Sequence, residues 1–423
     1  MNIRQISRTR LALSGVFVFC IVFNIELAWL EGYSLSNFVL LVGTLLLLST
    51  GQFAFAREQR FWLSLALAFP ALYISIFQTL FRESDANTLS LLYLKTRVYV
   101  FVAISVYWGL FLRTANGTPV QRVHFVMASV VWAFSVQAMF IAFSFVSPVF
   151  REFIDSLLVV KGNLTGLEGF RFKGLANSGG ANLSMAMSFA AMMAAYLAIV
   201  TQARNYALLA LLILAASALV GRSGLVGFAV ASMVFLARVL TKGDLSRART
   251  MGALLLFGGL VTVGVAELTT SLEEDVSLWW DWFSGQAGDS AIELWDLYAH
   301  EYSVPDLLIG KGFFETELYG ASRTDAGYLK TAFSVGVPAA ILFYAGLLVI
   351  FLTGARAFVS TASNKPIAAL FSMLLIFLIF FYESKESMAY QNFTGRLILF
   401  GFLLFQQIAP ANAAKRVQPL RAA

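Results

Sequence analysis

The sequence predicts an all-α polytopic membrane protein with about twelve transmembrane helices and a long external loop that carries short amphipathic helices. Three observations support this fold class. The 423 residues are 59% hydrophobic and only 13% charged, whereas soluble domains carry about 25% charged residues. Apolar runs of about 20 residues recur without the alternation that membrane β-strands require. A bilayer offers the backbone no hydrogen bonds, so these runs must be helical.

The predicted spans follow one another along a single transmembrane domain, residues 1–423. Arg4, Arg8 and Arg10 precede the first apolar run, which looks too long for a signal peptide and lacks a clear cleavage site, so we interpret it as a retained span. The spans lie at about 11–31, 34–56, 61–81, 97–113, 123–147, 182–201, 204–220, 223–240, 251–270, 327–352, 366–383 and 394–410.

Charge is sorted between the two sides of this arrangement. With a cytoplasmic N-terminus, 17 of the 30 Lys and Arg residues fall inside, but only Glu58 and Asp244 of the 24 acidic residues do. By the positive-inside rule both termini are cytoplasmic, and the long loops at about 148–181 and 271–326 are external. The basic composition therefore indicates a lipid bilayer as partner and no nucleic acid. The single cysteine, Cys20, excludes a disulfide within the chain.

The external loop at about 271–326 is the least expected feature of so apolar a chain. It carries Trp279, Trp280 and Trp282, and Ser290 to Glu293 fit a capping box before an amphipathic stretch. We expect a short helix at the membrane interface, either as an anchor or as a lid over a lipid-linked substrate. A long charged loop beside lipid favours chemistry at the membrane surface, since transporters keep their sites near the midplane.

Arg222 is the strongest candidate among the outward-facing cations. It lies in Gly221-Arg-Ser-Gly224, between two apolar runs with almost no loop between them. An arginine at such a depth usually faces a cavity or a ligand, and its guanidinium can bind phosphate with two hydrogen bonds. Any of the other cations can instead be solvated or paired with an acid. They are Lys161, Arg171, Lys173, Lys311, Arg323, Lys385 and Arg396.

Asp325 lies at the mouth of the tenth span, with Gly327 and Tyr328 just inside. Thr324 or Asp325 can cap that helix, and the Asp325 carboxylate can equally accept a proton from a sugar hydroxyl. The chain has no metal-ligand spacing, no phosphate-binding P-loop and no Ser/His/Asp arrangement, so we expect neither a metal nor a cofactor.

Four segments together resemble the O-antigen polymerase and ligase superfamily of bacterial inner membranes, which includes the Wzy-type polymerases. The resemblance covers residues 165–345 and rests on the order and outer placement of the segments. They are Arg171-Phe-Lys-Gly174 leading to Asn177, Gly221-Arg222-Ser-Gly224, Leu308-Ile-Gly-Lys-Gly-Phe313, and Asp325-Ala-Gly-Tyr-Leu-Lys-Thr-Ala-Phe-Ser-Val-Gly336-Val-Pro338.

This resemblance implies a metal-independent, inverting glycosyltransferase with a GT-C-like fold in the bacterial inner membrane. Its active site would face the periplasm and move an undecaprenyl-pyrophosphate-linked oligosaccharide onto an acceptor, with a chain-length regulator protein as a further partner. Arginines suit the leaving pyrophosphate, and a carboxylate suits the acceptor proton. On this basis Asp325 and Arg222 are the expected catalytic residues. The expected substrate-binding residues are Arg171, Lys173, Asn177, Lys311, Arg323 and Tyr328.

Two departures from the superfamily pattern refine this expectation. The ligases carry a His where this chain has Asp325, which favours a repeat-unit polymerase of a surface polysaccharide over a ligase. Relatives often place an Arg in the amphipathic loop segment, and residues 285–293 contain none, so Arg323 or Lys311 would substitute. The remaining alternatives are an O-antigen-type ligase, a transporter or flippase of lipid-linked oligosaccharide, and a non-catalytic scaffold.

Overall fold

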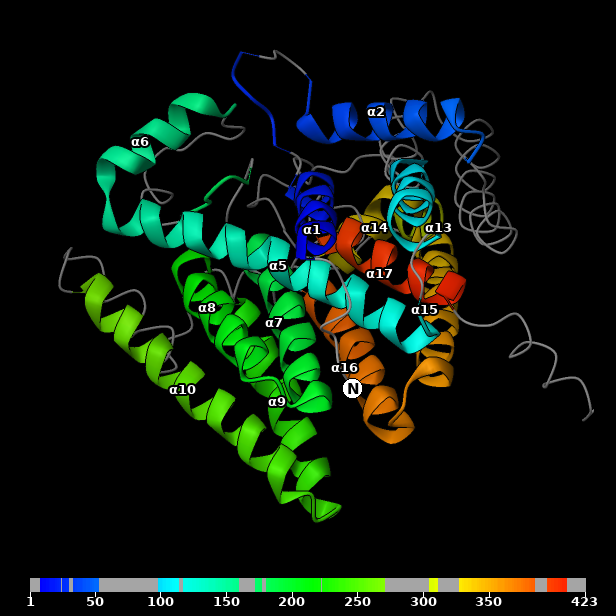
Figure 1. The fold of residues 1–423 in the computed structure, drawn as a ribbon. Helices are drawn as coiled ribbons and strands as arrows, with labels where there is room; N and C mark the ends of the chain where they lie inside the picture. The colour runs from blue at the N-terminus through cyan, green and yellow to red at the C-terminus, as the bar shows by residue number, and fades with distance from the viewer. Residues whose placement is uncertain are drawn as a thin grey trace, which may run out of the picture.

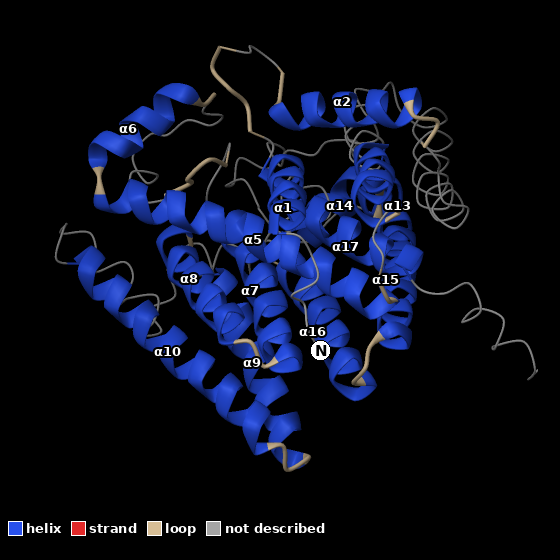
Figure 2. Cartoon of the chain, in the orientation of Figure 1, coloured by secondary structure: helices blue, strands red, loops and turns tan. Residues whose placement is uncertain are grey.

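The computed structural model confirms the all-α fold class for the part of the chain that it describes. Within those residues every regular element is a helix, and extended backbone is limited to two isolated bridges (Figure 2). The predicted span at 61–81 and most of the loop at 271–326 lie outside the described residues. The described ranges are 8–23, 25–29, 33–52, 98–113, 117–159, 172–176, 180–221, 223–270, 304–310, 327–384 and 394–408.

Five helices among these residues are long and apolar enough to cross a membrane. This supports a membrane-embedded protein, whereas the predicted total of about twelve spans is not tested. The five are α5 (Pro119–Val146), α7 (Ala181–Thr201), α9 (Ser223–Thr241), α15 (Val337–Thr361) and α16 (Lys365–Glu383).

The other described helices are shorter or less apolar than these five. The first two predicted spans are shorter than expected, because α1 ends at Phe23 and α2 ends at Ser49. After α1 the chain becomes extended, and Leu27 pairs with Leu158 in an isolated bridge. These helices are α1 (Arg8–Phe23), α2 (Leu35–Ser49), Val98–Leu112 with its π-helical end η2 (Trp108–Leu112), α6 (Pro148–Leu157), α8 (Arg204–Val220), α10 (Leu245–Thr270), α13 (Val304–Ile309), α14 (Gly327–Val335) and α17 (Thr394–Ile408).

Helix α7 forms the centre of the bundle, with α5, α8 and α9 packed around it (Figure 1). Its most apolar stretch is 94% buried, compared with 39% for α9 and α15. The sequence explains this position, since alanine and serine recur along α7. Lipid provides no hydrophobic drive for helix association, so small residues that allow close backbone approach favour such packing.

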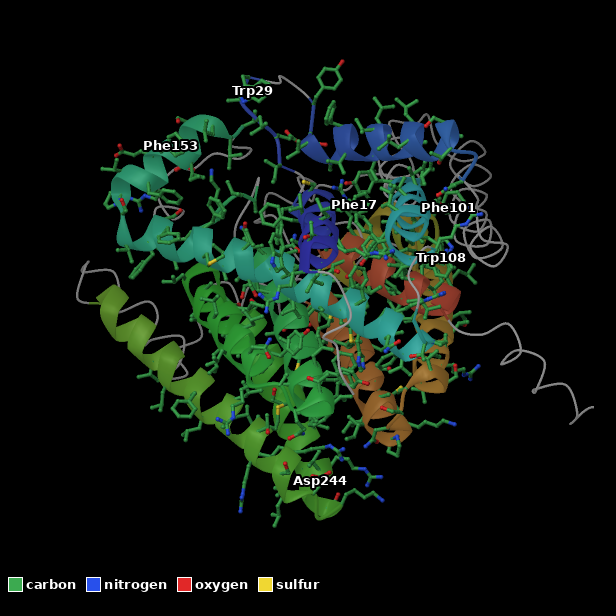
Figure 3. The ribbon with its side chains drawn as sticks, viewed as in Figure 1. Phe17, Trp29, Phe101, Trp108, Phe153 and Asp244 are labelled. Carbon is green, nitrogen blue, oxygen red and sulfur yellow. The ribbon has the colours of Figure 1, made fainter. Side chains whose placement is uncertain are left out.

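The described turns alternate between two ends of this bundle. The turn between α8 and α9 at Gly221, the start of α14 and the end of α16 lie together, and we call this the Gly221 end. The turns after α7, α9 and α15 lie at the opposite end, which we call the Asp244 end. Figure 3 shows Asp244 far from Trp29 and Phe153. The Asp244 end gathers the basic residues Arg204, Arg238, Lys242, Arg247, Arg249, Arg356 and Lys365.

The predicted span at 327–352 is a broken helix, which corrects the expectation of one continuous span. Gly336 has φ +82°, a left-handed conformation that ends α14, and α15 begins at Val337 with Pro338 in its first turn. A Cβ built on Gly310 would lie 2.5 Å from the backbone nitrogen of Gly336. The end of α13 therefore packs directly on the break, and only glycines allow this approach.

Candidate functional site

Most of the predicted site residues lie outside the described residues, but their neighbours in sequence are described. Only Lys173 and Tyr328 of the predicted set are described directly. The structure therefore locates the segments that carry the other candidates rather than their side chains. The predicted residues outside the described ranges are Arg171, Asn177, Arg222, Lys311, Arg323 and Asp325.

The segment 172–176 is held against α5 by one buried side chain, Gln137. Its amide nitrogen donates to the Lys173 carbonyl at 2.6 Å, and its amide oxygen accepts from the Leu175 N–H at 3.2 Å. Gln137 is fully buried, so both polar ends of its amide need partners, and the segment supplies them. The N–H of Phe172 also donates to the Leu219 carbonyl near the end of α8, at 3.4 Å.

The Lys173 side chain is engaged with α6 and not with an open cavity. Its ammonium nitrogen lies 2.9 Å from the Asp155 carboxylate, as an ion pair whose geometry is not that of an aligned hydrogen bond. The Lys173 side chain is 12% exposed. A second contact joins the two segments: the Arg151 guanidinium of α6 lies 5.7 Å from the centre of the Phe172 ring, next to Lys173. Lys173 therefore tethers α6, a helix within the predicted loop at 148–181 that the sequence analysis did not anticipate.

Ser184 of α7 clamps both ends of the turn that contains Arg222. Its hydroxyl donates to the Gly221 carbonyl and accepts from the Gly224 N–H at 3.1 Å, and it lies 3.0 Å from the Ser217 hydroxyl. The Ser217 hydroxyl also donates to the Ser184 carbonyl at 3.2 Å, so the two serines form one small buried network. Ser184 is fully buried, so water cannot replace these bonds. The backbone on both sides of residue 222 is thus fixed against α7.

Tyr382 joins the same turn to the end of α16. Its hydroxyl donates to the Gly224 carbonyl at 3.1 Å and lies 2.8 Å from the Ser188 hydroxyl. A Cβ on Gly227 would overlap the Tyr382 hydroxyl, and one on Gly224 would overlap the Ser184 carbonyl. The start of α9 therefore fits between α7 and α16 because glycines leave room for these contacts.

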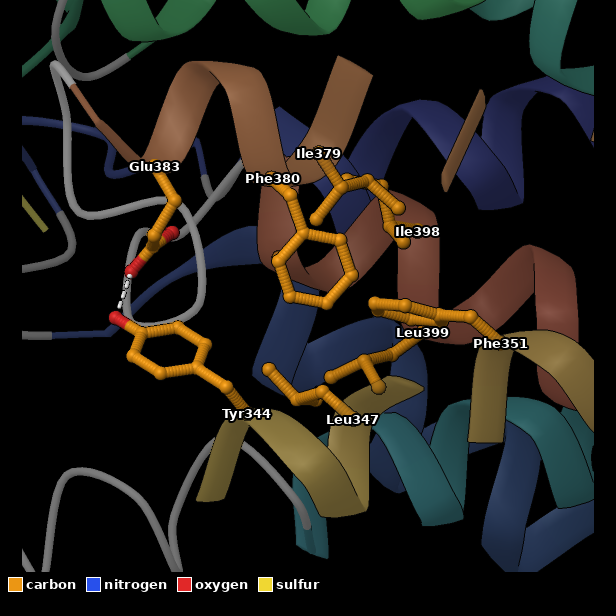
Figure 4. A pocket seen from close by; sticks show the side chains of 9 residues that line it. Tyr344, Leu347, Phe351, Ile379, Phe380, Glu383, Ile398 and Leu399 are labelled. Carbon is orange, nitrogen blue, oxygen red and sulfur yellow. Dashed lines mark hydrogen bonds between the residues drawn. The ribbon is translucent and has the colours of Figure 1, made fainter. Parts of the chain in front are cut away.

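The next residue on α16, Glu383, is bonded to α15 close to the start of α14 (Figure 4). The Tyr344 hydroxyl of α15 donates to the Glu383 carboxylate at 2.7 Å and lies 3.2 Å from the Gly327 carbonyl. Tyr328, a predicted substrate-binding residue, donates its hydroxyl to the Phe380 carbonyl at 2.8 Å. Its polar atom thus links α14 to α16. Gly327 is the residue two positions after Asp325, so this cluster lies at the mouth of the tenth predicted span.

Arg396 is one outward-facing cation that the structure uses to hold helices together. Its guanidinium lies 4.1 Å from the centre of the Tyr99 ring, and one of its nitrogens donates to the Ile21 carbonyl at 3.3 Å. Arg396 is buried, and its contacts join α17 to α1 and to the helix at 98–112. This packing favours a structural role for the residue.

Three of the predicted segments therefore gather at the Gly221 end. Residues 172–176 adjoin the end of α8, the turn at 221–224 is bonded to α7 and α16, and the start of α14 is bonded to α15 and α16. The sequence analysis missed the groups that join them, because single polar residues inside apolar spans resemble ordinary buried core residues. These groups are Gln137, Ser184, Tyr344 and Tyr382.

Comparison with protein-family models and with curated proteins finds no match for this chain. Among the described residues no group of three or more His, Cys, Asp or Glu side chains is placed to hold a metal ion. The fold and the described contacts define an all-α, membrane-embedded protein. One end of its helix bundle collects three of the four segments that the sequence analysis singled out.

Proposed function

We propose that this chain is a repeat-unit polymerase of a bacterial surface polysaccharide, a metal-independent, inverting glycosyltransferase with a GT-C-like arrangement of about twelve spans. In this proposal it lies in the inner membrane with both termini in the cytoplasm, and the Gly221 end faces the periplasm. It transfers glycan from undecaprenyl pyrophosphate to the next lipid-linked repeat unit. The enrichment of basic residues at the Asp244 end supports this orientation.

One observation carries the proposal. Tyr382 and Glu383 are consecutive on α16, and their side chains bond to Gly224 and Tyr344 respectively. These contacts bring the Arg222 turn and the segment after Asp325 to the same helix end, although more than 100 residues separate them in sequence. Arg222 and Asp325 carry the two kinds of group that the proposed transfer needs, and the described residues next to them in sequence lie at one end of α16.

The reaction assigns a task to each kind of group. The acceptor hydroxyl attacks the anomeric carbon as the bond to the pyrophosphate oxygen breaks, and negative charge grows on the leaving group. Arg222 would hold that pyrophosphate, with Arg171, Lys311 and Arg323 as further cations around it. Asn177 and Tyr328 would contact the glycan, and a carboxylate would accept the hydroxyl proton. Lys173 would contribute less than the arginines, since its ammonium is paired with Asp155.

The proposal is tested with purified protein in nanodiscs and a synthetic undecaprenyl-pyrophosphate repeat unit as both donor and acceptor. The expected product is a ladder of polymer lengths with release of undecaprenyl pyrophosphate, and it should be absent with Arg222→Ala at equal protein level. Transfer to a lipid or protein acceptor without a ladder would instead identify a ligase. No transfer to either acceptor, with intact monodisperse protein, would contradict a glycosyltransferase.

A flippase of lipid-linked oligosaccharide is the second candidate, because of the break at Gly336. Many transporters use discontinuous helices and ionisable residues inside the bundle, and this chain has a broken α14–α15 pair and a buried Glu383. However, Glu383 lies at the end of α16 and not at its midpoint. Movement of a labelled lipid-linked repeat unit across proteoliposomes, without any change in its glycan length, would favour this candidate.

A further inference from the structure

Helix α6 has a broad apolar face that the rest of the bundle covers on one side only. Phe150 and Ile154 lie one turn apart on the covered side, where Ile154 is buried and the Phe150 ring stacks on the Phe140 ring of α5, with 6.0 Å between centres. Val149 and Phe153 lie one turn apart on the adjoining side, since neighbouring residues of a helix differ by about 100°. They are 76% and 55% exposed. The uncovered side of this face indicates a partner.

The uncovered side of α6 continues the exposed surface of a membrane-spanning helix. Helix α5 is long and apolar enough to cross a membrane, and its last turn exposes Phe143 and Val146. Ser147 alone separates the two helices. Its backbone is extended, and its hydroxyl accepts from the Phe150 N–H at 3.2 Å to cap α6. Because one residue joins the helices, the lipid around the end of α5 also lies beside the start of α6 (Figure 1).

The length and charge of α6 place it along the membrane surface and not across the membrane. Its ten residues span about 15 Å at 1.5 Å per residue, which is half of the roughly 30 Å hydrocarbon core. Arg151, Glu152 and Asp155 occupy the other side of the helix. A helix with one apolar and one charged side lies in the plane of the interface, with its apolar side towards the acyl chains.

An exposed tryptophan lies beside α6 and suits the same level of the membrane. The Ala28 N–H donates to the Leu157 carbonyl at the end of α6, at 2.8 Å, so the neighbouring Trp29 is held next to this helix. Trp29 is 70% exposed, and Figure 3 shows it at the same end of the molecule as Phe153. Tryptophan favours the headgroup level, where its ring contacts apolar groups and its N–H stays hydrated.

We propose that α6 is a membrane-surface anchor whose partner is the phospholipid leaflet at the Gly221 end of the bundle. Val149 and Phe153 insert among the upper acyl chains, while Glu152 on the other side of the helix faces water. Trp29 lies at the headgroup level beside them. This inference requires only a membrane-embedded helix bundle, so it does not depend on the glycosyl transfer proposed above.

The charged side of α6 links this anchor to the segment 172–176. The Asp155 carboxylate pairs with the Lys173 ammonium at 2.9 Å, and the Arg151 guanidinium lies over the Phe172 ring. The apolar side of α6 thus contacts lipid while its charged side holds a second part of the chain. The depth of α6 in the leaflet therefore sets the level of residues 172–176 relative to the headgroups.

Spin labels on single cysteines measure this depth in a Cys20→Ala background, with the whole chain in nanodiscs of phosphatidylethanolamine and phosphatidylglycerol. The labelled variants are Val149→Cys and Phe153→Cys, and both replaced side chains are exposed, so their loss leaves the packing intact. Oxygen concentrates in lipid and a nickel chelate stays in water. We expect both labels to relax more with oxygen than with nickel, at a depth of about 5–10 Å into the boundary between headgroups and acyl chains.

Two control labels bracket the expected depth. Met233 is 55% exposed near the middle of the spanning helix α9, so the label on Met233→Cys should lie deeper in lipid. Glu152 is exposed on the charged side of α6, so the label on Glu152→Cys should relax more with nickel than with oxygen. Because Glu152 and Phe153 are consecutive, a difference between their labels reports the orientation of the helix and not its distance from the bundle.

Two results would overturn the anchor. A nickel response at Val149→Cys and Phe153→Cys equal to that at Glu152→Cys would place the whole of α6 in water. Shielding of both labels from oxygen and nickel would show that protein covers this face in place of lipid, and dipolar broadening between labels would identify a second copy of the chain. The measurement needs no activity, so a lack of polymer from the wild-type protein would refute the polymerase and not the anchor.

Discussion

The hydroxyl of Tyr382 lies 3.1 Å from the carbonyl oxygen of Gly224, so the end of α16 is bonded to the first turn of α9. Gly224 also donates its N–H to Ser184 of α7. Three helices thus converge on one glycine beside Arg222. This convergence makes the Gly221 end a well-defined structural unit, and it determines which substitutions there should be costly.

Gly224→Ala should destabilise the folded protein, because a Cβ there would overlap the backbone carbonyl of Ser184. Overpacking against backbone costs about 1–3 kcal/mol. Gly252→Ala is the matched control, since no atom lies within 4 Å of a Cβ at that helical position in α10. It should be neutral or stabilising by about 0.5–1 kcal/mol. Thermal unfolding in detergent, followed by the monodisperse fraction, checks both. A wild-type transition for Gly224→Ala would contradict the close packing.

Topology can be tested with single cysteines in a Cys20→Ala background. Ser156 on α6 and Lys242 between α9 and α10 are both exposed, and they lie at opposite ends of the bundle. We expect a membrane-impermeant maleimide to label Ser156→Cys in intact spheroplasts, because α6 belongs to a predicted external loop. Lys242→Cys should react only after permeabilisation. The reverse labelling pattern would contradict the proposed orientation, in which the Gly221 end faces the periplasm.

Metal dependence gives an independent check on the class of enzyme. The sequence has no metal-ligand spacing, and the proposed chemistry relies on arginines for the leaving pyrophosphate. Polymerisation should therefore proceed at an unchanged rate after dialysis against EDTA. The control adds back Mg²⁺ or Mn²⁺ and should give no increase. An absolute requirement for either ion would indicate a different glycosyltransferase class.

The sequence predicted the helical class and the position of most described helices, because apolar runs carry that signal directly. It did not predict the break at Gly336. The run from 327 to 352 is apolar on both sides of this residue, so its hydrophobicity gives no sign of the left-handed backbone at Gly336. It also missed α6, because a proline such as Pro148 followed by charged residues is typical of a loop. Ser184 and Tyr382 could not be identified, since their importance depends on contacts with residues 40 and 158 positions away.

The Ser184 clamp leads to a prediction about Arg222. Ser184→Ala would leave the half-buried Gly221 carbonyl and the buried Gly224 N–H without this partner, at a cost of about 1–3 kcal/mol. If the clamp positions Arg222, kcat should fall about 10-fold. This fall should exceed that in the matched variant Ser232→Ala, which loses a buried hydroxyl whose contact is with the Met192 sulfur at 3.8 Å.

Arg222→Lys keeps the charge but loses the paired hydrogen bonds, so it should lower activity about 10- to 100-fold, or roughly 1–3 kcal/mol. The double variant Ser184→Ala with Arg222→Lys distinguishes positioning from a general effect on folding. Residues that act together show non-additive changes. Because the clamp has little left to position once the guanidinium is gone, the double variant should lose little more activity than Arg222→Lys alone. Fully additive losses, at equal amounts of folded protein, would separate Ser184 from the function of Arg222.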